Sequence, residues 1–190
     1  MIFSIIVPVF NEEKTILKIF NILNNLSFLE FKKEIIVVDD GSTDNTRNIL
    51  NQNKSLYSSL YLNEKNMGKG AAVKLGLKNC KGDYVVFQDA DLEYDPNDLI
   101  KFEEVFLKFN ADGVIGSRFN YDKYTRSHSI MNKIGNYILT LLFNILYNTT
   151  FTDIYSCYFA FNKKLINFNN LKVDGFAQHA EILCKVIKSG

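Results

Sequence analysis

Two aspartates that lie two residues apart, Asp89 and Asp91, are the side chains of this sequence best suited to chemistry. In an extended chain such residues point to the same side, with Cα atoms roughly 6.5 Å apart. Their carboxylates repel each other, and Mg²⁺ or Mn²⁺ removes that repulsion because these ions prefer oxygen ligands. Glu93 continues the two-residue spacing as a third ligand. The alternative is an acidic cluster that stabilises a helix starting at Pro96, a role for which Asp95 is better placed.

Basic side chains that suit phosphate groups occur in two further places. Gly68-Lys69-Gly70 precedes an Ala-rich helix, and helix N-termini bind phosphate through their free N–H groups. A glycine turn before a helix is the alternative there, since the GxxxxGK[ST] pattern is absent. The segment 118–133 holds one acid, Asp122, and a group of basic side chains, which are Arg118, Lys123, Arg126, His128 and Lys133. Arginine binds phosphate with two parallel hydrogen bonds, so this segment is either a phosphate site or a solvated loop.

Short β-branched runs alternate with helical patterns along the whole chain. We predict strands at 2–7, 34–38, 60–62, 84–87, 114–115 and 158–161. We predict helices at 12–25, after 43–44, from 70 to about 78, and at 96–109, 130–147 and 177–188. This alternation predicts an α/β fold with a mainly parallel central sheet and helices on both faces. Neither a repeat nor a linker interrupts it, so residues 1–190 are interpreted as one domain.

Polar residues gather at the carboxyl ends of the first four predicted strands. The clusters are 11–13, 39–42, 66–70 and 88–93. Ligands of open α/β sheets bind beyond these strand ends. We therefore expect one binding site that combines all four clusters.

The composition excludes several classes of function. The chain has 22 basic and 21 acidic residues and a net charge of +1, whereas domains that coat nucleic acid carry a large basic excess. Its three scattered cysteines form no CxxC pair, which argues against a disulfide framework or a zinc site and favours a reducing compartment. No signal peptide is visible, and the apolar segment 134–147 is shorter than the roughly 20 residues that span a bilayer. We expect a soluble, cytoplasmic protein.

Six strings, taken in order, resemble the family-2 glycosyltransferases. The resemblance is strongest to the branch of dolichyl-phosphate mannosyl- and glucosyltransferases and their bacterial polyprenyl-phosphate relatives. The strings are VPVFNEE (7–13), VVDDGSTDNT (37–46), NMGKGAAVKLG (66–76), GDYVVFQDADLEYDP (82–96), GSRF (116–119) and TDIYSCYFAF (152–161). The resemblance implies a Rossmann-like GT-A fold and inverting transfer of a sugar to a polyprenyl or dolichyl phosphate. The implied donor is a nucleotide sugar of the GDP-mannose or UDP-glucose type. Family members usually continue further, so 1–190 would be a catalytic domain shortened at its C-terminus.

The resemblance also implies roles for residues at matching positions. The nucleotide would contact Pro8, Phe10, Glu12, Asp39, Asp40, Lys69 and Asp89. The Mg²⁺ or Mn²⁺ ion would be held by Asp89, Asp91 and Glu93. The catalytic residues would be Asp91, Arg118, Arg126 and Asp153. Two positions depart from the family pattern: Phe10 stands where a tyrosine is frequent, and Phe159 where bacterial relatives have a basic residue.

The acceptor decides whether a general base is needed. A phosphate acceptor is mostly ionised at neutral pH and needs none. A sugar hydroxyl needs one, for which Asp153 and Glu181 are the candidates, unless they serve as a turn residue and an exposed helix acid. Apolar residues at helical spacing within 133–147 either pack in the core or lie in a membrane surface. Lipid acceptors favour peripheral contact with the cytoplasmic face of a membrane.

Three other functions remain open from the sequence. The same fold could transfer sugar to a saccharide hydroxyl in surface-polysaccharide synthesis. The chain could be an inactive nucleotide-binding fragment. A nucleotidyltransferase is a weaker alternative, because the carboxylate pair alone does not exclude it.

Overall fold

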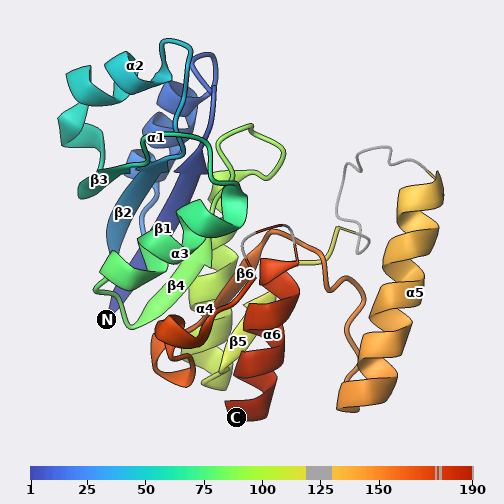
Figure 1. Cartoon of the computed structure of the whole chain (residues 1–190). Helices are drawn as coiled ribbons and strands as arrows, with labels where there is room; N and C mark the ends of the chain where they lie inside the picture. Colours follow the sequence, from blue (N-terminus) through green and yellow to red (C-terminus); the bar gives the residue numbers. More distant parts are fainter. Residues whose placement is uncertain (119–129, 174, 176, 190) are drawn as a thin grey trace.

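The structure, a computed structural model, describes residues 1–118, 130–173, 175 and 177–189 (Figure 1). Its centre is a six-stranded sheet with the order β3-β2-β1-β4-β6-β5. The strands are β1 (Ile2–Val9), β2 (Lys32–Asp39), β3 (Ser59–Leu62), β4 (Tyr84–Phe87), β5 (Gly113–Ile115) and β6 (Phe159–Asn162). The first four strands are parallel, whereas β6 runs antiparallel to both β4 and β5. The predicted α/β fold with a mainly parallel sheet is confirmed.

Helices cover both faces of this sheet. Those that cover it are α1 (Ile16–Asn25), α2 (Thr46–Gln52), α3 (Lys69–Asn79), α4 (Leu99–Phe109) and α6 (Gln178–Ser189), whereas α5 (Ile130–Tyr147) stands beside it. Short 3₁₀ turns are η1 (Lys54–Leu56), η2 (Pro96–Asp98), η3 (Lys163–Leu165) and η4 (Phe168–Asn170). Side chains of a strand alternate between faces. Phe3, Ile5 and Val7 accordingly pack in the cluster with α1 and α4, while Ile6 packs in the cluster with α3 and α6.

The helix predicted at 12–25 begins later than the start of that range, at the first residue of its apolar pattern. Asn11 has a left-handed backbone with φ 56°, and the backbone N–H of Glu12 donates to Oγ1 of Thr46 (2.8 Å). These contacts tie the chain after β1 to the loop after β2, so α1 starts only at Ile16. The helix predicted from Pro96 to Phe109 is present as η2 followed by α4, with Pro96 at a position that needs no backbone donor.

Helix α5 stands beside the body of the molecule (Figure 1). It packs against the segment that follows it, and at its C-terminal end the ring centroid of Tyr147 lies 5.8 Å from Nζ of Lys188 in α6. Within α5 only Thr140 and Phe143 are buried. The apolar side chains that are exposed instead are Ile130, Met131, Ile134, Tyr137, Ile138, Leu139, Leu141, Leu142, Ile145 and Leu146. The interpretation of this apolar pattern as a core helix is therefore wrong. In the described part of the chain, no helix combines the length and the apolarity required to cross a membrane.

Candidate active site

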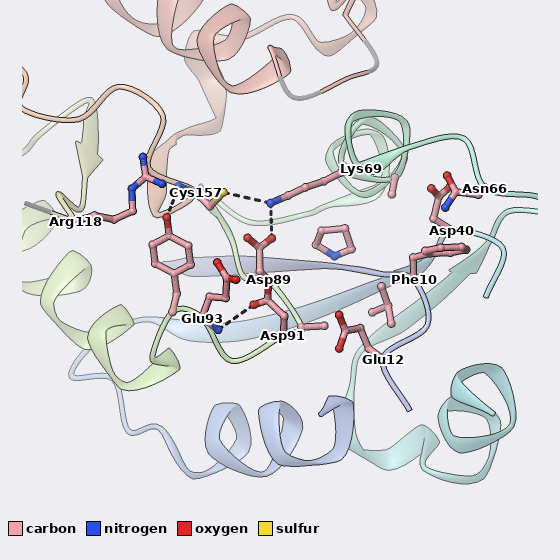
Figure 2. Close-up of a pocket in the computed structure, with 15 residues that line it drawn as sticks. Phe10, Glu12, Asp40, Asn66, Lys69, Asp89, Asp91, Glu93, Arg118 and Cys157 are labelled. Atoms are coloured by element: carbon pink, nitrogen blue, oxygen red, sulfur yellow. Dashed lines mark hydrogen bonds and ion pairs between the residues drawn. The ribbon is translucent and has the colours of Figure 1, made fainter. Parts of the chain in front are cut away.

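A pocket of about 380 Å³ opens where the carboxyl ends of β1, β2 and β4 meet the start of α3 (Figure 2). Its described lining is Pro8, Val9, Phe10, Glu12, Asp40, Asn66, Lys69, Ala72, Asp89, Ala90, Asp91, Glu93, Tyr94, Arg118 and Cys157. Cys157 reaches this edge because β6 is antiparallel, which places the residues before β6 next to the residues after β4. All four predicted polar clusters thus contribute to one site.

An ion pair between Lys69 and Asp89 lies inside this pocket (Figure 2). Lys69 Nζ is 2.5 Å from Asp89 Oδ1 and donates a hydrogen bond to Sγ of Cys157 (3.3 Å). Burial acts to lower the pKa of Lys69, but the charges and hydrogen bonds of Asp89 and Cys157 outweigh it and raise that pKa. Burial and the charge of Asp89 raise the pKa of Cys157 to about 11. Lys69 is therefore an ammonium ion beside a neutral thiol at neutral pH.

Asp91 and Glu93 follow on the same loop. Oδ1 of Asp91 accepts a hydrogen bond from the backbone N–H of Glu93 (2.9 Å). Burial, together with the negative charges of Asp89 and Glu93, raises the pKa of Asp91. Asp89 and Glu93 therefore lie close enough for their charges to act on Asp91, as the two-residue spacing predicts.

A buried hydrogen-bond network fixes the loop that carries these carboxylates. The amide of Gln88 donates to the carbonyls of Asp89 (3.1 Å) and Tyr94 (3.2 Å). Its Oε1 accepts from the hydroxyl of Tyr158 (2.8 Å), and that hydroxyl also lies 2.5 Å from the carbonyl of Asp95. Gln88 is fully buried. The loop conformation therefore depends on Tyr158, directly before β6, as well as on β4.

The two neighbouring aspartates at the end of β2 have different roles. Asp40 lines the pocket and accepts hydrogen bonds from the backbone N–H groups of Met67 (3.0 Å) and Gly68 (2.8 Å), which fixes the start of α3. Asp39 was expected to contact the nucleotide, but it is fully buried outside the pocket lining. Its carboxylate accepts from Nε of Arg47 at 2.7 Å. Successive side chains alternate across a strand, so only one of the two faces the pocket.

Asp153 was expected to be catalytic, and the structure places it behind the pocket. Its side chain is 0% exposed and forms a bidentate pair with Arg118, with Nε–Oδ2 at 2.7 Å and Nη2–Oδ1 at 2.9 Å. Asn136 Nδ2 and the backbone N–H of Tyr155 also donate to its Oδ1 (3.1 and 3.2 Å). The hydrogen bonds from Arg118 to Asp153 raise the pKa of Arg118. Asp153 thus holds Arg118, which lines the pocket.

The remaining predicted residues divide into three groups. Pro8, Phe10 and Glu12 line the pocket as expected. Glu181, the other candidate base, accepts hydrogen bonds from the backbone N–H groups of Lys172 (2.9 Å) and Val173 (2.9 Å). The expected phosphate contacts of Lys123, Arg126 and His128 lie outside the described residues.

Sequence reasoning missed Tyr94 and Cys157 as pocket residues. Burial and the charge of Cys157 raise the pKa of Tyr94 to about 12, and its hydroxyl accepts a hydrogen bond from the backbone N–H of Cys157 (3.2 Å). Both residues lie inside strings that resemble the family, which was the available signal. We did not single them out as pocket residues because tyrosine and cysteine side chains are only weakly polar.

The loop 89–93, called the carboxylate loop below, carries side chains whose chemistry suits a divalent cation. They offer oxygen donors in an open pocket, and burial together with the charges of Asp89 and Glu93 disfavours the charged form of Asp91, which a cation would favour. In the described ranges, however, no three His, Cys, Asp or Glu side chains are already gathered as a metal site. Asp89 is turned toward Lys69, and Asp91 toward the backbone of Glu93. Binding a metal would therefore require these side chains to reorient.

Comparisons with known proteins agree with this geometry. Residues 4–168 match the family described as Glycosyl transferase family 2. The UDP-N-acetylglucosamine–dolichyl-phosphate N-acetylglucosaminyltransferase of Methanococcus voltae is 31% identical in a 179-residue alignment that covers 85% of this chain and 70% of that protein. The dolichyl-phosphate beta-glucosyltransferase ALG5D of Trichomonas vaginalis is 34% identical over 157 residues, 73% of this chain and 47% of that protein. This chain thus spans between about half and seven tenths of these relatives.

A solved structure shows the same fold. It is glucosyl-3-phosphoglycerate synthase from Mycobacterium tuberculosis, in complex with Mn²⁺, UDP and glucosyl-3-phosphoglycerate. The two structures superpose with a TM-score of 0.72 at 20% identity, over 98% of this chain and 65% of that one. The fold is therefore GT-A, as predicted. With the family match over most of its length, the chain belongs to glycosyl transferase family 2.

Proposed function

We propose that this glycosyltransferase moves a hexose, with inversion, from a GDP- or UDP-linked donor to a polyprenyl or dolichyl phosphate, and that it needs Mg²⁺ or Mn²⁺. The observation that carries the proposal is the pocket at the ends of β1, β2 and β4, with its carboxylate loop facing the start of α3. Support for the acceptor comes from relatives whose names state dolichyl-phosphate transfer.

The charge of the pocket supports a metal requirement. Among the described residues that line it, five are acidic and two are basic. A nucleoside diphosphate is an anion, and binding it beside an excess of carboxylates is unfavourable unless a cation lies between them. Asp89, Asp91 and Glu93 would hold this cation. When bound, it stabilises the charge that develops on the leaving diphosphate.

The protein's own residues supply donor binding and orientation. The ring of Phe10, 41% exposed at the pocket rim, offers a face for stacking the base, near the carboxylate of Asp40 (Figure 2). Arg118, whose guanidinium is fixed by Asp153, stabilises phosphate charge through a preorganised cation. Attack on the face opposite the leaving group then inverts the anomeric carbon.

The two candidate general bases favour a phosphate acceptor. Asp153 is buried in its pair with Arg118, and Glu181 caps the backbone at 172–173, so each is already bound to other groups. A phosphate is already mostly ionised at neutral pH and needs no base to take its proton. A phosphate acceptor therefore agrees with the described site better than a sugar hydroxyl does.

Helix α5 supports an acceptor that is embedded in a membrane. Its exposed apolar side chains are interrupted by a single charge, Lys133. A second pocket of about 380 Å³ lies between α5 and the segment 151–152, and Lys133, Tyr137 and Leu141 line it. We propose that α5 lies in the cytoplasmic surface of a membrane, where such a helix buries its apolar side.

The test is transfer from labelled GDP-mannose, UDP-glucose and UDP-N-acetylglucosamine to undecaprenyl or dolichyl phosphate with Mn²⁺. We expect one donor to give a label that extracts into chloroform, and EDTA to abolish it. Label found only in a water-soluble glycan would favour a saccharide acceptor. Nucleotide binding without transfer to either acceptor would identify a nucleotide-binding fragment and contradict the proposal.

A further inference from the structure

The ammonium group of Lys69 lies against the carboxylate of Asp89, where a bound metal ion would also lie. Lys69 is the first residue of α3, where Gly68 adopts φ 92° and turns the chain into the pocket. The side chains of Lys69 and Asp89 are only 23% and 15% exposed, and their charged atoms are 2.5 Å apart. One proposed metal ligand therefore already has a cationic partner within the protein.

A divalent ion and this ammonium group oppose each other at Asp89. Mg²⁺ binds carboxylate oxygens at about 2.0–2.1 Å. An ion at that distance from Asp89 would lie within a few ångströms of Lys69 Nζ, where two positive charges repel strongly because the site is partly shielded from water. The close pair seen here and a metal bound at the same oxygen, Oδ1 of Asp89, therefore exclude each other.

We propose that Lys69 is a resident counter-ion of Asp89, which the metal displaces and which then turns to the diphosphate of the donor. This inference rests on the metal requirement in the proposed function. It gives Lys69 a positioning role: the pair keeps Asp89 neutralised in the empty enzyme, and its opening couples metal binding to nucleotide binding.

Cys157 makes this movement feasible. Its Sγ accepts a hydrogen bond from Lys69 at 3.3 Å, and a thiol is a weak acceptor. When Lys69 leaves Asp89, it can therefore keep its contact with Cys157. Cys157 lies beside Lys69 and Asp89 in the pocket (Figure 2). Because the metal and the diphosphate each favour the open pair, each raises the affinity for the other by the same factor.

The first experiment measures Mn²⁺ binding by electron paramagnetic resonance, without and with UDP or GDP. We expect Lys69→Met to bind Mn²⁺ about 10-fold more tightly than wild type without nucleotide, and to show less enhancement when nucleotide is added. Lys78→Met is the matched control, because it removes the same charge from an exposed position at the far end of α3. We expect the control to stay within about twofold of wild type, because an exposed, distant charge is screened.

The second experiment observes the ammonium group of wild type directly. In ¹⁵N-lysine-labelled protein, the Nζ signal that is missing in both Lys69→Met and Lys69→Arg is that of Lys69, and it reports the pair. We expect saturating Mg²⁺ to shift or broaden it through faster exchange with water. A signal that stays unchanged while Mg²⁺ saturates the site overturns the displacement but leaves the proposed function intact. Wild type that binds no Mn²⁺, even with UDP or GDP, overturns the metal requirement itself and this inference with it.

Discussion

Replacing Asp153 with Asn tests whether this carboxylate holds Arg118 or takes a proton from the acceptor. The side chain of Asp153 is 0% exposed and accepts two hydrogen bonds from the guanidinium, at 2.7 and 2.9 Å. Asn keeps the shape but removes the negative charge and one acceptor oxygen. Arg118 then loses the negative charge that Asp153 provides and is held less firmly.

The expected loss of stability in Asp153→Asn follows from the burial of the Arg118–Asp153 pair. Removing one partner of a buried ion pair costs about 3–5 kcal/mol. Because the side chain of Arg118 is 27% exposed, water replaces part of the lost interaction, and we expect the free energy of unfolding to fall by about 2–3 kcal/mol. That corresponds to about a 30- to 140-fold change in the unfolding equilibrium constant.

The assay combines urea unfolding with transfer kinetics. If Asp153 positions Arg118, Asp153→Asn loses stability and its KM for the donor rises. If Asp153 is a general base, the variant unfolds like wild type yet its kcat collapses, and that result would refute the positioning role. Asp98→Asn is the control, since Asp98 pairs with Lys101 on the surface at 2.8 Å and its loss should cost no more than about 0.5 kcal/mol.

Three further predictions concern the pocket and its support. Asp91→Ala is expected to abolish transfer and to weaken Mn²⁺-dependent nucleotide binding in titrations, and full activity would remove Asp91 from the mechanism. Tyr158→Phe leaves the buried Oε1 of Gln88 without its donor, so urea unfolding should show a loss of about 1–3 kcal/mol; unchanged stability would show that the network does not hold the loop. Burial and the charge of Lys69 lower the pKa of His179 to about 4, against about 6.5 when unfolded. Between these values the unfolded state binds more protons, so stability should rise with pH from 4 to 6.5, by up to about 3 kcal/mol. His179→Gln should flatten this rise, and an equal slope in both proteins would contradict the assignment.

The sequence predicts those parts of the site whose positions depend only on which strand a residue follows. Lys69, Asp89 and Asp91 follow predicted strands whose carboxyl ends meet at one edge, so parallel pairing brings them together. The sequence could not show which of Asp39 and Asp40 faces the pocket, because that depends on the side-chain direction at the end of β2.

Contacts between residues far apart in the sequence were the second part of the site that could not be predicted. Asp153 and Arg118 are separated by 35 positions, and nothing in either string reveals that one is bound by the other. The exposure of α5 was hidden for a related reason. An apolar stripe shows that a helix seeks an apolar surface, but it does not show whether the protein itself provides that surface.

The antiparallel pairing of β5 with β6 has a consequence for how such enzymes change. Ile115 pairs with Phe159, and the backbone N–H of Gly116 donates to the carbonyl of Tyr158 (2.8 Å). The stretch between Ile115 and Phe159 includes α5. Its two ends lie side by side at this edge of the sheet. The entropy of closing such a loop depends only weakly on its length. The middle part of the stretch, α5, can therefore be exchanged by recombination or by design while the strands keep their register, provided that Arg118, Cys157 and Tyr158 at the two ends of the stretch are retained for the pocket.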